Sequence, residues 1–265
     1  MDFGISGKVA FVTGGSKGMG RDVAHMLAAE GCRVAVAART KADVDDAVAS
    51  IKSQGGEAIA IYGDISVEAD TKRMVAECTA KLGAPLIVIG QTKHNVPGDF
   101  ADITDYQHYY DSFQSYTMSQ LYLLHAVLPA MKEAGWGRFV HIGSATAKEP
   151  EGAIHHAIAN TTRPSTVGML KTVSDEYARY GITVNTIAPG WIATENAYSY
   201  MRRNIGIDTE EERTDWMRTV AKVPAARMGT SEEIASTVVY LCSEGAGYVT
   251  GCWIEVDGGH HRSAF

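Results

Sequence analysis

Three closely spaced glycines near the start of the chain are the first residues whose pattern points to chemistry. In the segment TGGSKGMG, Gly14, Gly18 and Gly20 follow the spacing T-G-x-x-x-G-x-G. Glycine permits a turn with positive φ and a close approach of the backbone to an anion, and the free N–H groups of a following helix attract the same anion. The pattern predicts a loop that binds a pyrophosphate. The loop residues expected at the nucleotide are Gly14, Ser16, Lys17, Gly18, Met19 and Gly20.

The sequence on both sides of this loop fits a β-strand that runs into a helix. Residues 9–13 form a short β-branched run, and the segment from Arg21 to Gly31 has the apolar period and the glycine stop of a helix. A glycine triplet alone is a weak signal. At the first strand-to-helix turn of a β-α-β unit, however, it is typical of a dinucleotide site.

The end of the second predicted strand indicates which dinucleotide binds. Proteins that prefer NAD hold an acidic side chain there against the ribose 2′-hydroxyl. Here the segment 37–40 reads AART and contains no acid. Arg39 and Lys17 are placed to pair with a 2′-phosphate through charge-assisted hydrogen bonds worth about 1.5–3 kcal/mol each. We therefore expect NADP(H), the alternative being that both cations are solvated surface residues.

Seven short apolar runs alternate with amphipathic segments along the chain. The predicted strands are Val9–Thr13, Arg33–Ala37, Ala58–Tyr62, Leu86–Ile89, Arg138–Ile142, Thr183–Ile187 and Trp253–Val256. Strands separated by helical segments favour a parallel sheet, because each crossover places a helix over one face. At 265 residues and 45% hydrophobic content, the chain suits one large core. We expect one α/β domain over residues 1–265, a doubly wound Rossmann fold with a seven-stranded parallel sheet flanked by helices.

Charge and composition exclude several classes of partner. Lys and Arg total 24 and Asp and Glu total 31, so the net charge is −7, with no basic block. This balance argues against nucleic-acid and anionic-membrane partners. The start of the chain lacks a secretory-signal pattern, and no apolar run approaches about 18 residues, so a cytoplasmic protein is expected. The four cysteines lack C-x-x-C spacing, which favours reduced, mostly buried thiols, and no metal site is expected.

Motifs over almost the whole chain resemble the short-chain dehydrogenase/reductase family. Besides the glycine loop, the chain carries GDIS, AVLPAM, GWGRFVHIGS, GITVNTIAPGWIAT and YVTGCWIEVDGG. The resemblance implies an NADP(H)-dependent oxidoreductase that acts on a carbonyl or alcohol substrate. The further cofactor-binding residues that it implies are Asp64 at the adenine ring, its neighbour Ile65, and Pro189, Gly190, Ile192 and Thr194 at the nicotinamide.

The positions of the family's catalytic residues hold other residues in this chain. The family uses a tyrosine as acid/base, a lysine four residues later, a serine at the substrate carbonyl and an asparagine that binds a relay water. Counting back without gaps from GITVN places Ala159 at the tyrosine and Arg163 at the lysine position, while Ser144 matches the serine. Counting back from AVLPAM places Tyr116 at the asparagine position, and the family's Asn-Asn-Ala-Gly reads GQTK at residues 90–93.

Three hypotheses follow for the activity. In the first, the chain remains an oxidoreductase in which Tyr116 donates the proton beside Ser144 and Arg163; arginine can bridge ribose hydroxyls but cannot relay protons. In the second, the pocket performs lyase, hydrolase or isomerase chemistry with His155 or His156 as base and NADP as a structural or electrostatic element. In the third, the chain binds NADP(H) without catalysis. Halohydrin dehalogenases also place arginine at the lysine position, but they keep the tyrosine and lose the glycine loop.

Simpler roles are open for the same residues. Adjacent loop histidines such as His155 and His156 are often solvated, and His94 is ambiguous in the same way. Tyr116 lies in a tyrosine-rich segment, YQHYYDSFQSYTMSQLY, that also suits packing between subunits.

Other features bear on the substrate and on assembly. The segment at about 195–225 is longer and more charged than a tight connection, which favours a substrate lid or a solvated helix pair. The GQTK segment places a cation and an amide at the pocket wall, so the expected substrate is a small molecule, polar or carboxylate-bearing. The family resemblance implies assembly into dimers or tetramers through residues 106–131, residues 164–180 and the last strand. Both helical segments carry apolar stripes beyond what one core needs, so we expect a homotetramer. These stripes contain Leu121, Leu124, Leu128, Val167, Leu170 and Val173.

Overall fold

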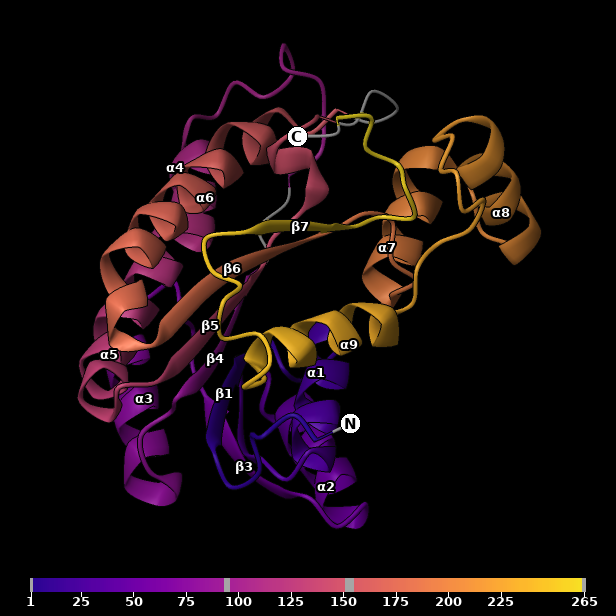
Figure 1. Cartoon of the computed structure of the whole chain (residues 1–265). Helices are drawn as coiled ribbons and strands as arrows, with labels where there is room; N and C mark the ends of the chain where they lie inside the picture. The colour runs from indigo at the N-terminus through magenta and orange to yellow at the C-terminus, as the bar shows by residue number, and fades with distance from the viewer. Residues whose placement is uncertain (1, 93–95, 151–154, 264–265) are drawn as a thin grey trace.

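The chain forms one parallel β-sheet with helices on both faces (Figure 1). The computed structural model describes residues 2–92, 96–150 and 155–263. Within these ranges the strand order is β3-β2-β1-β4-β5-β6-β7, and every neighbouring pair is parallel. The predicted seven-stranded doubly wound sheet is therefore confirmed.

Each strand begins and ends within two residues of its expected bounds. The strands are β1 (Val9–Thr13), β2 (Arg33–Ala38), β3 (Glu57–Tyr62), β4 (Ile87–Gln91), β5 (Gly137–Ile142), β6 (Ile182–Pro189) and β7 (Trp253–Val256). The ends of β4 and β6 each extend two residues beyond the expected bound, and at β6 the pairing with β7 continues to Pro189. Proline at the last position of a strand loses little, because its missing N–H is not needed beyond the ladder.

The helices of the described ranges cover the sheet in two layers. They are α1 (Gly18–Ala29), α2 (Lys41–Ser53), α3 (Glu68–Leu82), α4 (Gln107–Phe113), α5 (Ser119–Ala134), α6 (Ala157–Tyr177), α7 (Glu195–Tyr200), α8 (Glu210–Thr219) and α9 (Ser231–Cys242). Short turns of 3-10 helix, η2 (Ala145–Ala147) and η3 (Ala178–Tyr180), and of π-helix, η1 (Gln114–Met118) and η4 (Met201–Ile205), join them.

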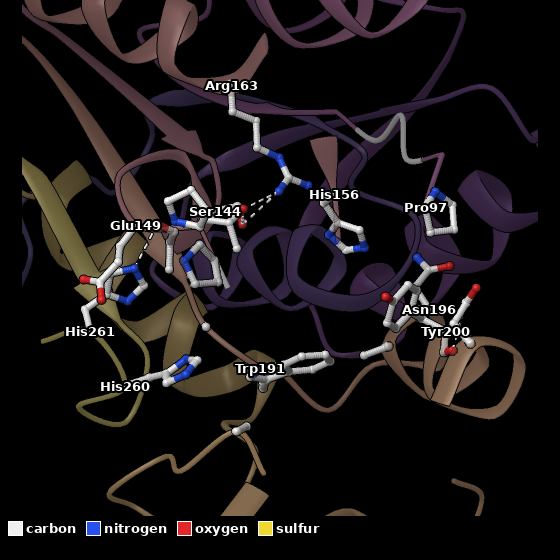
Figure 2. Close-up of a pocket in the computed structure, with 18 of the residues that line it drawn as sticks. Pro97, Ser144, Glu149, His156, Arg163, Trp191, Asn196, Tyr200, His260 and His261 are labelled. Atoms are coloured by element: carbon white, nitrogen blue, oxygen red, sulfur yellow. Dashed lines mark hydrogen bonds between the residues drawn. The ribbon is translucent and has the colours of Figure 1, made fainter. Parts of the chain in front are cut away.

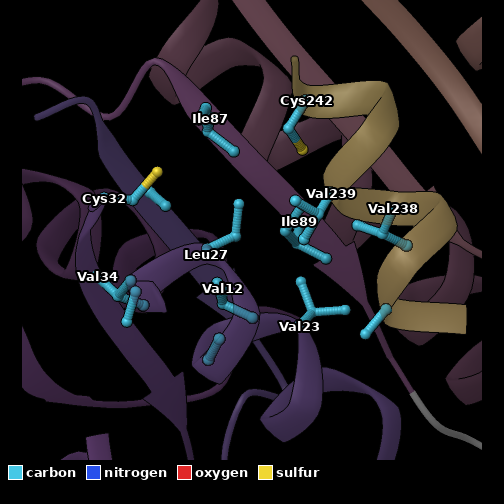
Figure 3. Close-up of a cluster of buried hydrophobic side chains, with 14 of the residues drawn as sticks. Val12, Val23, Leu27, Cys32, Val34, Ile87, Ile89, Val238, Val239 and Cys242 are labelled. Atoms are coloured by element: carbon cyan, nitrogen blue, oxygen red, sulfur yellow. The ribbon is translucent and has the colours of Figure 1, made fainter. Parts of the chain in front are cut away.

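Alternation along the strands builds one core on each face of the sheet. Val12 of β1 packs against α1, α2 and α9, whereas its neighbour Phe11 packs against α3, α5 and α6. Figure 3 shows the first of these cores, in which Val23 and Leu27 of α1 and Val238 of α9 lie together on one face of the sheet. Since successive strand residues point to opposite faces, a strand buried on both sides is expected to be apolar, and β1 is apolar up to its last residue, Thr13.

The segment at 195–225 forms helices with an apolar cluster of their own. Met201, Trp216 and Met217 are buried together, and the Trp216 ring meets the Trp191 ring edge-on at 4.9 Å between centroids. Two helices, α7 and α8, therefore occupy this segment, and in Figure 1 they lie beyond the end of the sheet, beside the C-terminal ends of β6 and β7. Whether the segment acts as a lid stays a prediction.

The apolar stripes that favoured a tetramer have another explanation in the structure. Leu124, Leu128 and Leu170 are buried in the chain's own second core, so they are not left over for a partner. At the start of α4, by contrast, Tyr106 and Tyr110 are 75% and 71% exposed. The argument from the stripes was wrong for Leu124, Leu128 and Leu170, whereas Leu121, Val167 and Val173 are half-buried. The homotetramer itself stays a prediction.

The four cysteines are free thiols. Cys32, Cys78 and Cys242 are buried and Cys252 is exposed. Burial raises the pKa of Cys32 and of Cys78 to about 12, which keeps both thiols protonated and unreactive near neutral pH. In the part of the chain that the structure describes, no helix is long and apolar enough to cross a membrane.

Two glycines allow a test of how the junction between α6 and β6 is built. Gly181 and Gly55 both have positive φ, 72° and 86°, but a Cβ on Gly181 would lie 2.3 Å from the Gly135 carbonyl oxygen, whereas Gly55 has open space. We expect Gly55→Ala to lower the free energy of unfolding by about 1 kcal/mol for the left-handed backbone. Gly181→Ala should lower it by about 3 kcal/mol, because the junction must also shift. Urea denaturation of both variants measures this, and equal losses would contradict the clash.

Candidate active site

The glycine loop lies at the point between β1 and β4 where the strand order reverses. Gly14 and Gly18 have φ values of 61° and 52°, and a Cβ on Gly20 would lie 2.4 Å from the Gly14 carbonyl oxygen. The N-cap residue of α1, Lys17, accepts no hydrogen bond through its side chain from the first N–H groups of the helix. These N–H groups therefore face the loop without a side-chain acceptor from the N-cap. Because these positions are glycines, the loop leaves a space that larger side chains would fill. This cradle fits the pyrophosphate of a dinucleotide.

A buried amide faces this loop from the end of β4. Gln91 Oε1 has no hydrogen-bond partner in the described ranges, and it lies 2.7 Å from the position of a Cβ on Gly20. Thr13 Oγ1 accepts a 2.8 Å hydrogen bond from the backbone nitrogen of Gln91, and this bond ties β4 to β1 beside the crevice. Buried polar atoms without a partner are rare in native proteins, and one aimed at a crevice indicates where a ligand or water binds.

The cations expected at the 2′-phosphate lie at the rim of the crevice. Lys17 Nζ is 2.8 Å from Asp43 Oδ2, and Arg39 Nη1 is 3.5 Å from Asp64 Oδ2. Both cationic side chains are more than two-thirds exposed. Exposed ion pairs of this kind are worth at most about 1 kcal/mol, less than a charge-assisted bond to phosphate, so these pairs can open for a nucleotide.

The segment expected at the nicotinamide faces the same crevice. Pro189 ends β6, and Thr194 caps α7 by accepting a 3.2 Å bond from the Ala197 amide. The Thr194 methyl carbon lies 3.4 Å from the position of a Cβ on Gly18, which places this segment against the glycine loop. Of the remaining residues expected at the cofactor, Ser16 and Met19 lie in the loop, Asp64 and Ile65 follow β3, and Gly190 and Ile192 follow β6.

The guanidinium of Arg163 is the centre of the candidate active site (Figure 2). Its Nη1 donates to Thr146 Oγ1 at 2.6 Å and to Ser144 Oγ at 3.3 Å, and its Nη2 donates to Tyr116 Oη at 3.0 Å. Tyr116 and Ser144, which motif counting singled out together with Arg163, therefore both lie within hydrogen-bond distance of the Arg163 guanidinium. Thr146 was missed, because a threonine two residues beyond the motif serine carries no signal of its own.

Three separate elements deliver these side chains to one place. Arg163 lies in the first half of α6, and Ser144 follows β5 and directly precedes η2. Tyr116 lies in η1, a single stretch of π-helix between α4 and α5. Such stretches insert an extra residue into a helix and often mark functional sites. Ala159, at the expected tyrosine position, is buried and brings no functional group to the site.

Arg163 carries a charge without a carboxylate partner. Among the described residues, no Asp or Glu oxygen lies within 4.0 Å of its guanidinium, and Arg163 Nε is buried without a hydrogen-bond partner. Neutral hydroxyls are therefore its nearest counter-groups. A partly buried cation of this kind favours an anion, or a developing negative charge, next to it.

The two neighbouring histidines lie in different surroundings. The side chain of His155 is 68% exposed and pairs with Asp99, and His155 does not line the cavity described below. His156 is 8% exposed, lines that cavity, and has a buried Nε2 without a partner in the described ranges. Burial, and next the charge of Arg163, lower the pKa of His156 to about 4. Lys93 and His94 lie outside the described residues.

A cavity of 710 Å³ opens beside Arg163. Its walls come from the segment after β5, the end of β6, α7 with η4, and residues 260–262 (Figure 2). Its lining includes Ser144, His156, Pro189, Trp191, Tyr200 and His260. This volume is in the range that holds small organic ligands. The described residues contain no cluster of His, Cys, Asp and Glu suited to a metal ion.

A buried contact from the end of the sheet holds the segment after Ser144. His261 Nδ1 is 2.7 Å from Asp257 Oδ2 and His261 Nε2 is 3.0 Å from the Ala145 carbonyl oxygen. Burial alone would raise the pKa of the Asp257 carboxyl, but hydrogen bonds from His261 and Gly259 hold that pKa below its usual value. Sequence analysis missed this pair, because an Asp and a His four residues apart after β7 are a weak sequence signal.

Two buried neutral histidines should make stability depend on pH. Burial lowers the pKa of His141 and of His156 to about 4, so between that pH and about 6.5 only the unfolded chain takes up these protons. The free energy of unfolding should therefore fall as the pH drops from 7 to 5, by about 2 kcal/mol for each histidine. We expect the fall, measured by urea denaturation, to be smaller by about 2 kcal/mol in His156→Gln. His125→Gln, at an exposed position of α5, is the control, and an unchanged fall in His156→Gln would contradict the assignment.

The sequence matches the family described as Enoyl-(Acyl carrier protein) reductase over residues 14–261. It is 32% identical over 263 residues to the 3-oxoacyl-(acyl-carrier-protein) reductase FabG of Pseudomonas aeruginosa, and the alignment covers 98% of this chain and 99% of that protein.

Two solved structures have the same fold. The L-sorbose reductase of Gluconobacter frateurii, complexed with NADPH and L-sorbose, is 28% identical with a TM-score of 0.89, over 99% of this chain and 100% of that chain. An NADPH-bound short chain oxidoreductase of Pseudomonas aeruginosa PAO1, described as containing an atypical catalytic center, is 25% identical with a TM-score of 0.91, over 99% and 100%. The chain belongs to the short-chain dehydrogenase/reductase family and is an oxidoreductase of that family.

Proposed function

We propose that the chain uses NADP(H) to interconvert a carbonyl and an alcohol at a rearranged active site. The single observation that carries the proposal is the Arg163 guanidinium, which donates to three hydroxyls beside the cavity. The residues expected at the nicotinamide, Pro189 and Gly190, line the same cavity. The residues that would hold the nicotinamide therefore lie at the same cavity as the positive charge of Arg163.

Ser144 and Arg163 stabilise charge on the substrate oxygen. NADP(H), when bound, supplies or accepts the hydride. As a carbonyl becomes an alcohol its oxygen gains negative charge, and the Ser144 hydroxyl and the Arg163 N–H groups are donors that need no rearrangement to meet it. Removing one such donor typically costs about 2.7–4 kcal/mol of transition-state stabilisation. Arg163 keeps its own proton throughout, so it provides charge and position rather than acid catalysis.

Tyr116 is the proposed proton donor. Its Oη accepts a bond from Arg163 Nη2, which leaves the phenolic hydrogen without an acceptor among the described residues. The side chain is 6% exposed and does not line the cavity itself, so the proton passes to the substrate through a water or a small shift of Arg163. The Pseudomonas aeruginosa relative described as having an atypical catalytic center supports such a rearrangement within the fold.

His156 is the weaker candidate for proton transfer. A general base works best when its pKa is close to the ambient pH. The pKa of His156 is about 4, so its imidazole is too weak a base to remove a proton efficiently from a substrate at neutral pH. The non-redox hypothesis depends on this residue, because His155 lies outside the cavity lining. The neutral imidazole of His156 suits a hydrogen bond that orients the substrate.

The α7–α8 segment is proposed to close over the substrate. Asn196 and Tyr200 of α7 line the cavity, and the apolar cluster around Trp216 lets the segment move as one piece. We also retain the homotetramer as a proposal. The exposed aromatic residues Tyr106 and Tyr110 of α4 are better candidates for a subunit contact than the leucines of α5.

Cofactor preference follows from the rim of the crevice. We expect NADPH to bind about tenfold more tightly than NADH, because Arg39 and Lys17 can pair with the 2′-phosphate and β2 ends without an acid. Calorimetric titration with each nucleotide measures the ratio. Arg39→Ala should bring the ratio close to one, whereas Lys52→Ala, at an exposed position of α2, should leave it unchanged. Equal affinities in the unmodified protein would contradict the proposal.

Substitution of Tyr116 tests the proposed acid. With a carbonyl substrate found by following NADPH oxidation, Tyr116→Phe should lower turnover by a factor of about 10² or more, the range for losing a general acid, with little change in NADPH affinity. Tyr109→Phe is the matched control, because its buried hydroxyl has no hydrogen-bond partner in the described ranges and lies away from Arg163.

Two results would redirect the assignment. Full turnover in Tyr116→Phe together with loss of turnover in His156→Ala would support a histidine mechanism instead. Absence of NADPH oxidation with every carbonyl compound would favour a non-redox enzyme or a silent NADP(H)-binding protein.

A further inference from the structure

The cavity beside Arg163 is positively charged although the chain as a whole is acidic. Among the described residues that line it are four permanent cations, Arg163, Arg203, Lys222 and Arg262, and one carboxylate, Glu149. The net charge of the chain is −7. A cleft lined by one sign of charge raises the local concentration of ligands of the opposite sign.

Three of these cations have no carboxylate partner. No Asp or Glu oxygen in the described ranges lies within 4.0 Å of the side-chain nitrogens of Arg203, Lys222 or Arg262, whereas Arg202, the neighbour of Arg203, pairs with two acids. Glu149 Oε2 accepts a 3.4 Å bond from the Arg262 backbone nitrogen rather than from its guanidinium. The three side chains come from η4, from the connection after α8 and from residues after β7, so separate parts of the fold bring them to one cavity.

The backbone at Lys222 is held in a conformation that side chains rarely adopt. Its φ is 56°, in the left-handed region that costs a residue other than glycine about 1–2 kcal/mol. Ala221 and Val223 on either side are buried, and Val223 donates a 2.8 Å backbone bond to Met217. The apolar cluster of α8 therefore fixes this turn, and the strained residue is one that lines the cavity, an association common at ligand sites.

We propose that the cavity binds a small carbonyl or alcohol substrate that carries an anionic group, a carboxylate or a phosphate, held by Arg203, Lys222 and Arg262. This inference rests on the proposed function for the reacting end of the substrate. Arg163 is hydrogen-bonded to Ser144, Thr146 and Tyr116, so it meets the reacting oxygen, while the three exposed cations at the mouth meet the distal anion.

Binding measurements test the anion site without requiring turnover. The probes are a series of short-chain oxo acids of increasing length, the methyl ester of each acid, and the matching phosphate monoesters, titrated by calorimetry into protein saturated with NADP⁺. We expect some acid or phosphate to bind about tenfold or more tightly than its neutral ester, with a preference that shrinks as salt is added. The acid and phosphate arms identify which anion is used.

Variants locate the anion. Arg203→Gln and Lys222→Gln should each reduce the preference for the anion over the ester by about tenfold, because each removes one charge that the ester does not use. Arg218→Gln is the control, since Arg218 lies on α8 and pairs with Asp215 away from the cavity. Equal binding of anion and ester, no binding by any member of the series, or an unchanged preference in both variants would overturn the anion site. Binding with no NADPH oxidation would leave the anion site standing and contradict only the proposed reaction.

Discussion

The positive charge of Arg163, which has no carboxylate partner among the described residues, organises the candidate active site. The Arg163 guanidinium joins a hydroxyl from the segment after β5, a second from η2 and a phenol from the π-helical turn before α5. A planar guanidinium with five donors is suited to hold several acceptors in one fixed arrangement, which a lysine ammonium would do less rigidly. Arg163 therefore lies at the centre of a network of three hydroxyl groups.

The two halves of the ligand site rest on different physical constraints. The nucleotide half is built from backbone: glycines with positive φ, a helix N-terminus, and a crevice that exists wherever a doubly wound sheet reverses its strand order. The substrate half is built from side chains on helices and connections beyond the sheet. Side chains in the second half can change without changing the sheet or the cradle, because functional groups are carried by a fold that does not depend on them.

Sequence patterns predicted the sheet and the cradle because these depend on local signals, namely apolar runs, helix periodicity and glycine spacing. Motif counting also selected Tyr116, Ser144 and Arg163, which the structure brings together. Gly90 leaves room for the side chain of Gln120, because a Cβ at position 90 would lie 2.0 Å from Gln120 Oε1. Motif counting could not show this contact, since the two residues lie on different elements. The leucine stripe of α5 misled for the same reason, since a periodic pattern does not say which surface covers it.

The bond between His261 and the Ala145 carbonyl joins residues 116 positions apart, and it holds the segment that carries Ser144. The contact brings the chain that follows β7, the strand paired with β6 at the edge of the sheet, back to the segment after β5. Closing so long a loop is slow compared with forming the adjacent β1-β2-β3 crossovers, so the nucleotide cradle is expected to assemble before the reactive site does. A partly folded chain with the cradle formed and the Ser144 segment not yet in place would bind a dinucleotide but could not catalyse a reaction. The order of assembly therefore separates binding from reactivity in time.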